Sequence, residues 1–589
     1  MHDLVIRNGT VIEGTGAPRR QADVAVSGGL VTAVEPKAGA ARRDIDADGL
    51  LVLPGWVDIH THYDGQATWD PAMTPSSWHG VTTTIFGNCG VGFAPVRPGT
   101  EGFLINLMEG VEDIPEIVLS EGVDFRWETF SEYLDVLEET PRVMDIGAQV
   151  PHAALRFYVM GERGADHAAR PTDDEITRMG ELLEEGLAAG AFGFTTSRTP
   201  KHRAADGRPT PSLTAEHPEL AGMALAMKRA GTGLIQVNSD FGEGEFALLR
   251  AAAELAGRPL SVLLVQMAIA PDRWAETLAA VDRAYADGLD VTAQTGSRPI
   301  GVMLGLQASQ HPFVTHPLWQ ELQQLDHETR IDRLTSDSEL RRRLVEERPD
   351  DDYSRQMASI LESTFELGDP LNYEPEYRAS VANRAREAKR DPFDLALDLL
   401  LQDGGRRLLL HTFENYCHGD LDVVYQMLAN PNTVCGIADG GAHVGLICDS
   451  GSPTSLLTHW ARDRTRGPRL PLEFLVHKQT AATARTYGLH DRGVILPGYR
   501  ADINVIDFAD LHLERPFVVH DLPAGGKRIV QRSIGYRHTF VHGTEVRQND
   551  EDTGARPGRL LRGSRSGPGG RSLPARRLAP DDFAVKPHA

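Results

Sequence analysis

Several features are scarce in this sequence, and each scarcity excludes a class of protein. Its four cysteines are too few for a disulfide scaffold in 589 residues and are typical of a reducing compartment. No apolar run approaches about 20 residues, so we expect no membrane span. The 60 Lys and Arg residues are fewer than the 83 Asp and Glu residues, and the resulting formal net charge of -23 repels nucleic acid. The N-terminus lacks the basic and apolar regions of a signal peptide, so we predict a cytoplasmic protein.

Both ends of the chain have the pattern of short β-strands. Residues rich in Val, Ile and Thr occur at 4–6, 10–12, 24–26 and 31–34, and again at 501–506 and 538–543. Turn pairs such as Asn8-Gly9 separate them. Neither end alone has enough strands to enclose a core. We therefore predict one β-sandwich assembled from residues 1–56 and 486–550.

Between these ends, eight short apolar runs alternate with helical patterns. The runs occupy residues 55–60, 82–87, 143–148, 192–195, 234–237, 261–265, 289–293 and 435–439, and the clearest helices are expected over 173–189 and 219–230. Continuous apolar strands that alternate with helices indicate a parallel sheet buried on both faces. Eight of them predict an α/β fold, a (β/α)8 barrel over residues 57–485.

Two segments depart from this rhythm. Residues 300–405 are helical and strongly charged, and we interpret them as an insertion at the barrel mouth. They act either as a lid or pocket wall, or as peripheral packing. Residues 551–589 are rich in Gly, Pro, Arg and Ser and are predicted to form a flexible tail.

His60-Thr61-His62 is the first motif with chemical content. It is expected to end the first barrel strand, where residues i and i+2 face the same side. Two imidazoles on one side, at the C-terminal end of a barrel strand, form half of a zinc-type site.

The motif lies inside a phrase that resembles a known family. Pro54-Gly55-Trp56-Val57-Asp58-Ile59-His60-Thr61-His62 is similar to the metal-binding first strand of the amidohydrolase superfamily. Gly87-Asn88-Cys89-Gly90 resembles the D-aminoacylase (N-acyl-D-amino-acid deacylase) branch, in which a cysteine after the second strand ligates metal. Further similarity lies at residues 150–156, 190–194, 289–293, 436–440 and 493–502, and the resemblance covers residues 1 to about 545.

This resemblance implies a metal-dependent hydrolase of a non-peptide amide, similar to the N-acyl-amino-acid deacylases. It implies that His60, His62, Cys89 and Asp439 hold a divalent metal, with zinc expected from the thiolate and imidazole ligands. Asp439, expected at the end of the last strand, would also shuttle a proton between the attacking water and the leaving amine.

The sequence also departs from the family pattern. The histidine expected after the fifth strand falls on Asn238 or Ser239, and the one after the sixth falls on Gln266. The lysine that holds the substrate carboxylate in D-aminoacylase is replaced by Ala268. Because amides are poor zinc ligands, we predict one metal ion rather than two.

Other polar residues near the predicted strand ends are candidates for accessory roles. For substrate binding we name Asn238, Gln266, Arg198, His152 and His443, and as replacement ligands we consider His152, His202, Asp240, His411 and His443.

Two alternatives stay open beside the amide hydrolase. The same scaffold could act on a cyclic amide, a carbamate or an ester, or carry out a non-hydrolytic decarboxylation. The loss of two histidines also allows a non-catalytic binding protein with this fold. We expect a small-molecule amide as the partner, neither nucleic acid nor a membrane, and leave open whether the chain forms a homo-oligomer.

Overall fold

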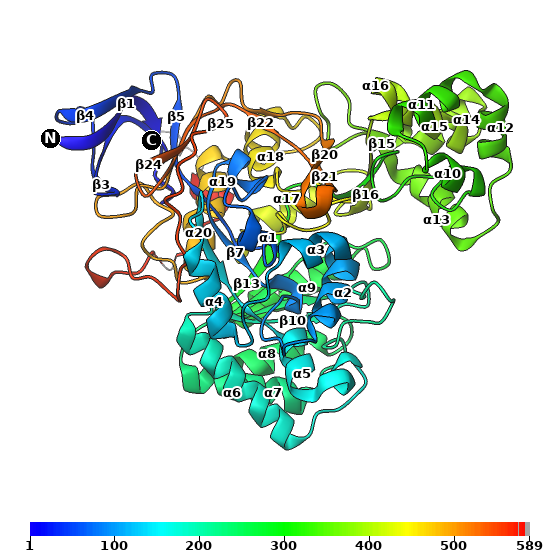
Figure 1. Ribbon diagram of the computed structural model, residues 1–589. Coiled ribbons are helices and arrows are strands. Elements are labelled where there is room, and N and C mark those ends of the chain that lie inside the picture. Colours follow the sequence, from blue (N-terminus) through cyan, green and yellow to red (C-terminus); the bar gives the residue numbers. More distant parts are fainter. Residues whose placement is uncertain (575, 584–589) are drawn as a thin grey trace.

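A computed structural model describes residues 1–574 and 576–583 (Figure 1). The two ends of the chain form one nine-stranded sheet, in the order β25-β24-β23-β18-β5-β1-β2-β3, with β4 paired to β1. Its strands are β1 (His2–Val11), β2 (Arg20–Ser27), β3 (Leu30–Glu35), β4 (Ala41–Asp46), β5 (Leu51–Pro54), β18 (Ile503–Ile506), β23 (Tyr536–Val541), β24 (Thr544–Gln548) and β25 (Glu551–Asp552). The two ends join where Val52 pairs with Val505. The β-sandwich predicted from the two ends takes the form of this one nine-stranded sheet.

One detail of this sheet differs from the prediction. The turn expected at Asn8-Gly9 is a bulge inside β1, because the pairing with β2 shifts register between Ile6 and Gly9. A bulge inserts one extra residue without ending the strand. Asn8 has a positive φ of 58°. A Cβ on Gly9 would lie 2.4 Å from Val52 Cγ2, so the strand can pass β5 only with glycine there.

The middle of the chain supplies eight parallel barrel strands. They are β6 (Trp56–Asp58), β7 (Val81–Phe86), β8 (Asp145–Ala148) continued by β9 (Val150–Pro151), β10 (Gly193–Arg198), β11 (Leu234–Ser239), β12 (Leu260–Leu263), β13 (Val291–Thr295) and β17 (Thr433–Cys435). Pairing runs β6-β7-β8 and β9-β10-β11-β12-β13-β17. The segments that follow β17 and β6 are joined by His62 N–H to Gly440 O, at 2.8 Å, and by Asp439 N–H to His60 O, at 3.2 Å. The predicted (β/α)8 architecture is confirmed.

Helices cover the outside of the barrel. They are α1 (Gln66–Trp69), α2 (Glu101–Glu112), α3 (Glu116–Gly122), α4 (Phe130–Glu139), α5 (His152–Met160), α6 (Asp173–Ala189), α7 (His217–Ala230), α8 (Glu245–Ala256), α9 (Arg273–Ala286), α17 (Asp422–Ala429), α18 (Ser452–Thr458), α19 (Leu472–Gln479) and α20 (Ala481–Thr486). Helix α6 has the predicted bounds because Thr172 and Glu175 form a capping box and Gly190 ends it at φ 116°. Within the described ranges, no helix has the length and apolar character of a membrane span.

The insertion begins with β14 (Ile300–Leu304) and ends with β16 (Leu409–Glu414), which pair with each other beside β15 (Thr364–Glu366). Between them lie α10 (Pro317–Leu322), α11 (His327–Ser336), α12 (Ser338–Glu346), α13 (Asp352–Ile360), α14 (Val381–Ala388), α15 (Pro392–Leu400) and α16 (Gln402–Gly405). These helices share a separate hydrophobic core and form a lobe beyond β15 and β16, away from α5–α8 (Figure 1). The end of β16 returns to the barrel mouth, because the Glu414 carboxylate binds Lys201 Nζ at 2.6 Å.

The described part of residues 551–589 corrects the prediction of a flexible tail. Leu560, Leu561 and Leu573 are buried, and Leu561 N–H donates to Ile146 O at 2.7 Å. A Cβ on Gly558 would lie 2.1 Å from Met144 O, so glycine lets the segment run directly against the barrel. The leucines of this segment are too far apart to form a helix or strand pattern in the sequence, yet each packs against the barrel.

Candidate metal centre

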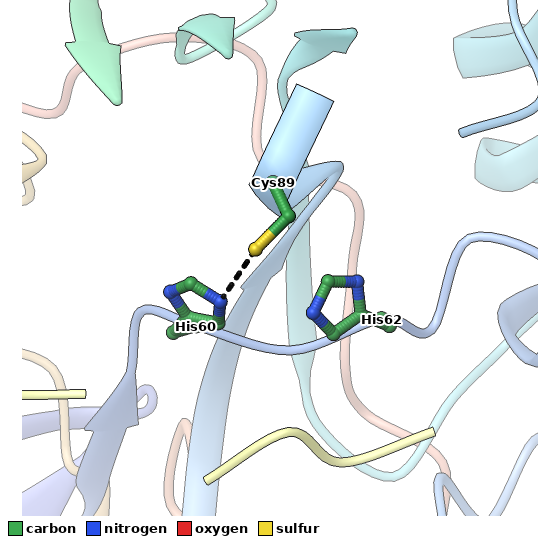
Figure 2. Close-up of side chains that lie close together, drawn as sticks. All are labelled: His60, His62 and Cys89. Carbon is green, nitrogen blue, oxygen red and sulfur yellow. Dashed lines mark hydrogen bonds between the residues drawn. The ribbon is translucent and has the colours of Figure 1, made fainter. Parts of the chain in front are cut away.

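His60 and His62 lie just beyond β6 rather than inside it, since the strand ends at Asp58. Both rings nevertheless face the same space, as Figure 2 shows, with centroids 5.5 Å apart. His60 Nε2 lies 3.3 Å from Cys89 Sγ. Ligand atoms of these three buried residues all lie within 4.8 Å of one another, which is the spacing of a shared metal ion.

Cys89 owes its position to a strained turn after β7. Its φ is 57°, and Gly87 and Gly90 on either side also have positive φ. The Cys89 N–H donates to Gln236 Oε1 at 3.0 Å, which fixes the turn against β11. The turn reverses the chain so that the thiol points at His60 (Figure 2). Positive φ at a non-glycine residue costs energy and often accompanies functional sites.

The two imidazoles are oriented from behind by polar side chains. His60 Nδ1 lies 2.7 Å from Gln294 Oε1, so the proton belongs on Nδ1 and the lone pair on Nε2. His62 Nδ1 lies 3.2 Å from Glu112 Oε1. Both Nε2 atoms then face Asp439 Oδ1, at 3.6 Å from His60 and 3.7 Å from His62. Such outer contacts are how proteins orient metal-binding histidines.

Asp439 reaches this point from a loop, which corrects the prediction that it ends the last strand. Strand β17 stops at Cys435, and Ile437 and Asp439 both have positive φ. The loop can approach because Gly441 follows: a Cβ there would lie 2.8 Å from the His62 carbonyl oxygen.

Glu112 lies at the centre although the sequence pattern did not predict it. It is the last residue of α2 and is 1% exposed, between His62 and His443, whose Nε2 lies 3.5 Å from Glu112 Oε2. Asp113 Oδ2 accepts the Gly445 N–H at 2.9 Å and ties this helix end to the 439–445 loop. No motif surrounds Glu112, and only tertiary packing brings it to the centre. Gln294 was also missed, although a polar residue in a buried strand is a signal.

The electrostatics of the cluster suit a divalent cation. Asp439 Oδ1 is buried without a hydrogen-bond partner, and the two Glu112 oxygens face the imidazoles of His62 and His443, at 3.2 and 3.5 Å. Burial raises the pKa of the Glu112 and Asp439 carboxyls, and burial beside these two groups raises the pKa of the Cys89 thiol. Burial lowers the pKa of His60 to about 4, so its imidazole is neutral and can donate a lone pair.

Two predicted residues adjoin the cluster. Asn238 Nδ2 lies 3.5 Å from Cys89 Sγ and 3.2 Å from His202 Nε2. Asn238, and not Ser239, therefore faces the cluster, because Ser239 Oγ accepts the Phe241 N–H instead. His443 Nε2 lies 3.5 Å from Glu112 Oε2, so the Glu112 carboxylate lies close to both His62 and His443.

The other predicted residues have partners outside the cluster. Gln266 Oε1 accepts the Cys417 N–H at 3.1 Å. Arg198 is bound to Glu245 and Ala215 O, and both nitrogens of His152 are engaged, by Thr196 and Glu219, each at 2.9 Å. Of the remaining replacement ligands, His411 contacts Ser363 and Asp240 lies 3.4 Å from Lys201.

Comparison with known proteins gives a consistent set of relatives. A family model described as "Amidohydrolase family" matches residues 43–345 and 383–547. A D-aminoacylase of Alcaligenes xylosoxydans xylosoxydans is 29% identical over 95% of this chain and 97% of its own, and an N-acyl-D-aspartate deacylase of the same organism is 28% identical over 95% of both.

Solved structures agree with these relatives. A D-aminoacylase described with a binuclear metal centre matches with a TM-score of 0.63 at 26% identity, over 96% of this chain and 100% of that one. An N-acyl-D-glutamate deacylase of Bordetella bronchiseptica, solved with zinc and a phosphonate inhibitor, matches with a TM-score of 0.62 at 25% identity, over 95% and 99%.

Proposed function

Because this chain belongs to the amidohydrolase family, we propose that it hydrolyses the carbon–nitrogen bond of a non-peptide amide, with N-acyl amino acids as the substrate class. The observation that carries this proposal is the convergence of His60 Nε2, His62 and Cys89 Sγ within 4.8 Å, with Asp439 Oδ1 facing both imidazoles.

The donor set fits one divalent ion. Two neutral imidazoles, a thiolate and a carboxylate are the ligands that zinc prefers. Asp439 Oδ1, buried without a hydrogen-bond partner between the two Nε2 atoms, and the buried Glu112 carboxylate behind His62 both favour added positive charge at this point. Asn238 stands beside Cys89 with an amide in place of an imidazole, which supports one ion rather than two.

Each residue of the cluster has a distinct expected role in the reaction. His60, His62, Cys89 and Asp439 would hold a divalent ion, which would supply Lewis acidity for water and for a carbonyl oxygen. The Asp439 carboxylate would accept a proton from the attacking water and return it to the leaving nitrogen. Gln294 and Glu112 hold the two rings in place, and the buried walls exclude bulk water.

Lys201 bears on which N-acyl amino acids fit. Its Nζ lies 3.4 Å from the Sδ atom of Met267, the residue before Ala268, the position where D-aminoacylase carries lysine. Glu414 and Asp240 already bind it, at 2.6 and 3.4 Å. Two carboxylates at the mouth repel a second negative charge on the substrate. We therefore expect N-acyl derivatives of neutral amino acids to be preferred over those of Asp and Glu.

Two measurements test the function. Protein purified without chelator should contain close to one equivalent of zinc, manganese or iron by mass spectrometry. It should release amino acid from a panel of N-acetyl-D and N-acetyl-L amino acids with neutral and acidic side chains. The hydrolase hypothesis would be wrong if the protein held well under one equivalent of metal and took up none when these ions were added. If the protein held a full equivalent of metal but turned over no amide, cyclic amide, carbamate or ester, the chain would instead be a non-catalytic binding protein with this fold.

A further inference from the structure

A cavity of about 820 Å³ lies at the end of the barrel opposite the metal centre. Its walls include Phe192, Leu234, Pro259 and Asp290, each within one residue of the start of β10, β11, β12 or β13. The metal centre, in contrast, lies beyond the C-terminal ends of the strands. Further parts of the wall come from the ends of α9 and α20 and from residues 564–566, 572–573 and 577. We call this space the floor cavity.

The floor cavity is strongly basic in a protein that is strongly acidic overall. Arg258, Arg485, Arg565 and Arg577 line it, and Asp290 is its single carboxylate among the described residues. Asp290 is already bound to Arg577 Nη2 at 2.6 Å. The whole chain carries a formal charge of -23, so this concentration of guanidinium groups runs against the composition. An arginine cluster in a concave wall with little counter-charge is a site for an anion.

The arginines are held in place rather than loose on the surface. Arg577 Nη1 donates to Val291 O at 2.6 Å, and its guanidinium stacks 3.9 Å from the centroid of the Tyr285 ring. Arg258 Nε donates to Gly233 O at 2.8 Å. Burial lowers the pKa of both groups, and the nearby Arg485 lowers that of Arg577 further. Burying fixed cations side by side is unfavourable, and a bound anion would relieve this repulsion.

His490 adds a neutral donor to the same wall. The Leu573 N–H donates to His490 Nδ1 at 3.1 Å, so in the neutral ring the proton lies on Nε2. Burial lowers the pKa of His490, which keeps the ring neutral. The hydroxyl groups of Ser564, Ser566 and Ser572 also line the cavity. The wall thus offers planar cationic donors together with neutral ones, which suits a multiply charged oxyanion.

We propose that the floor cavity binds a small, multiply charged anion, the chemistry shared by phosphate-bearing metabolites and polycarboxylates. At about 820 Å³, the space is within the size range of small-molecule sites. The site joins the barrel floor to the C-terminal segment, so bound anion should also hold that segment in place. The proposal does not depend on the reaction at the metal centre.

Titration with pyrophosphate and with citrate, by calorimetry and thermal denaturation, tests the site on the full chain. We expect at least one of the two anions to bind saturably and to raise the Tm, whereas potassium chloride at matched ionic strength should do neither. Tighter binding of pyrophosphate would indicate a phosphate-bearing ligand, and tighter binding of citrate would indicate a polycarboxylate. No saturable binding, or an equal shift with chloride, would overturn the proposal.

Variants locate the binding. Arg565→Gln and Arg485→Gln should each weaken it about tenfold or more, since each removes charged donors. Arg576→Gln is the matched control, because Arg576 neighbours Arg577 in sequence, is absent from the cavity wall and binds Asp582. Arg565 is half-buried, and its backbone bonds to Gly488 O and from the His490 N–H, both at 2.8 Å, are kept in the variant, so the variant should fold normally. Undiminished binding in both cavity variants, or equal weakening in the control, would exclude this cavity.

Discussion

At the scale of residues, the candidate centre is a set of side chains whose neighbours fix their protonation and direction. His60 points its Nε2 at Cys89 because Gln294 occupies its Nδ1. His152, which looked equally suitable in the sequence, has both nitrogens engaged by Thr196 and Glu219. Two histidines near the ends of barrel strands therefore have different expected roles, and substitution can separate them.

We expect His60→Ala to abolish metal binding and hydrolysis while the fold is kept, because it removes one converging donor. His152→Ala should retain its metal but lose about 2 kcal/mol of unfolding free energy, since it leaves buried Glu219 with fewer partners. Metal content by mass spectrometry and urea denaturation measure both. The assignments would be reversed if the metal were lost from the His152 variant and kept in the His60 variant.

Glu112 is expected to act through His62. Glu112→Gln removes the charge 3.2 Å from His62 Nδ1 while keeping the size of the side chain. Loss of such an outer contact should weaken metal affinity by about 10- to 100-fold. Competition with a chromophoric chelator measures this affinity. Glu109→Gln, an exchange of the same type on the same helix, serves as the control. An unchanged metal affinity in Glu112→Gln would remove Glu112 from the centre.

At the scale of elements, the segments between strand ends and helices position the chemistry. Neither the histidine pair nor Asp439 lies in a strand, and Cys89 lies in a turn with positive φ. The 439–445 loop is fixed by backbone hydrogen bonds to residues 60 and 62, and by Asp113 at the end of α2. Close approach of this loop depends on its glycines.

Two glycines with similar backbone angles test this dependence. Gly441 has φ 89°, and a Cβ there would lie 2.8 Å from the His62 carbonyl oxygen. Gly207 has φ 86° and open space around it. Gly207→Ala should cost only the backbone strain, about 1 to 2 kcal/mol. Gly441→Ala should cost more and also lower metal content, because the loop that carries Asp439 must shift. Equal unfolding free energies and equal metal content would contradict this role of Gly441.

At the scale of the whole molecule, the barrel, the helical lobe and the terminal sheet each have a hydrophobic core. The barrel core, the core of the helical lobe and the core of the terminal sheet are separate clusters. The C-terminal segment beyond the sheet packs back on the barrel through Leu560 and Leu561 and helps to enclose the floor cavity. It should therefore unfold together with the barrel.

Leucine substitutions test that attachment. Leu561→Ala should lower the unfolding free energy by about 2 to 4 kcal/mol, since it empties a buried site. Leu225→Ala, at a position 41% exposed on α7, should cost less than about 1 kcal/mol. Urea denaturation followed by far-UV circular dichroism measures both. If Leu561→Ala were as mild as the control, residues 551–583 would be attached only loosely.

Local patterns in the sequence predicted the barrel, from apolar runs of strand length, and the pairing of His60 with His62, from their fixed spacing. The place of Cys89 beside them came from the resemblance to the amidohydrolase family. Tertiary structure alone decided that Glu112 faces His62, that Arg198 and His152 have partners elsewhere, and that the C-terminal segment is packed. Each of these depends on contacts between residues far apart in the chain, which no local pattern encodes.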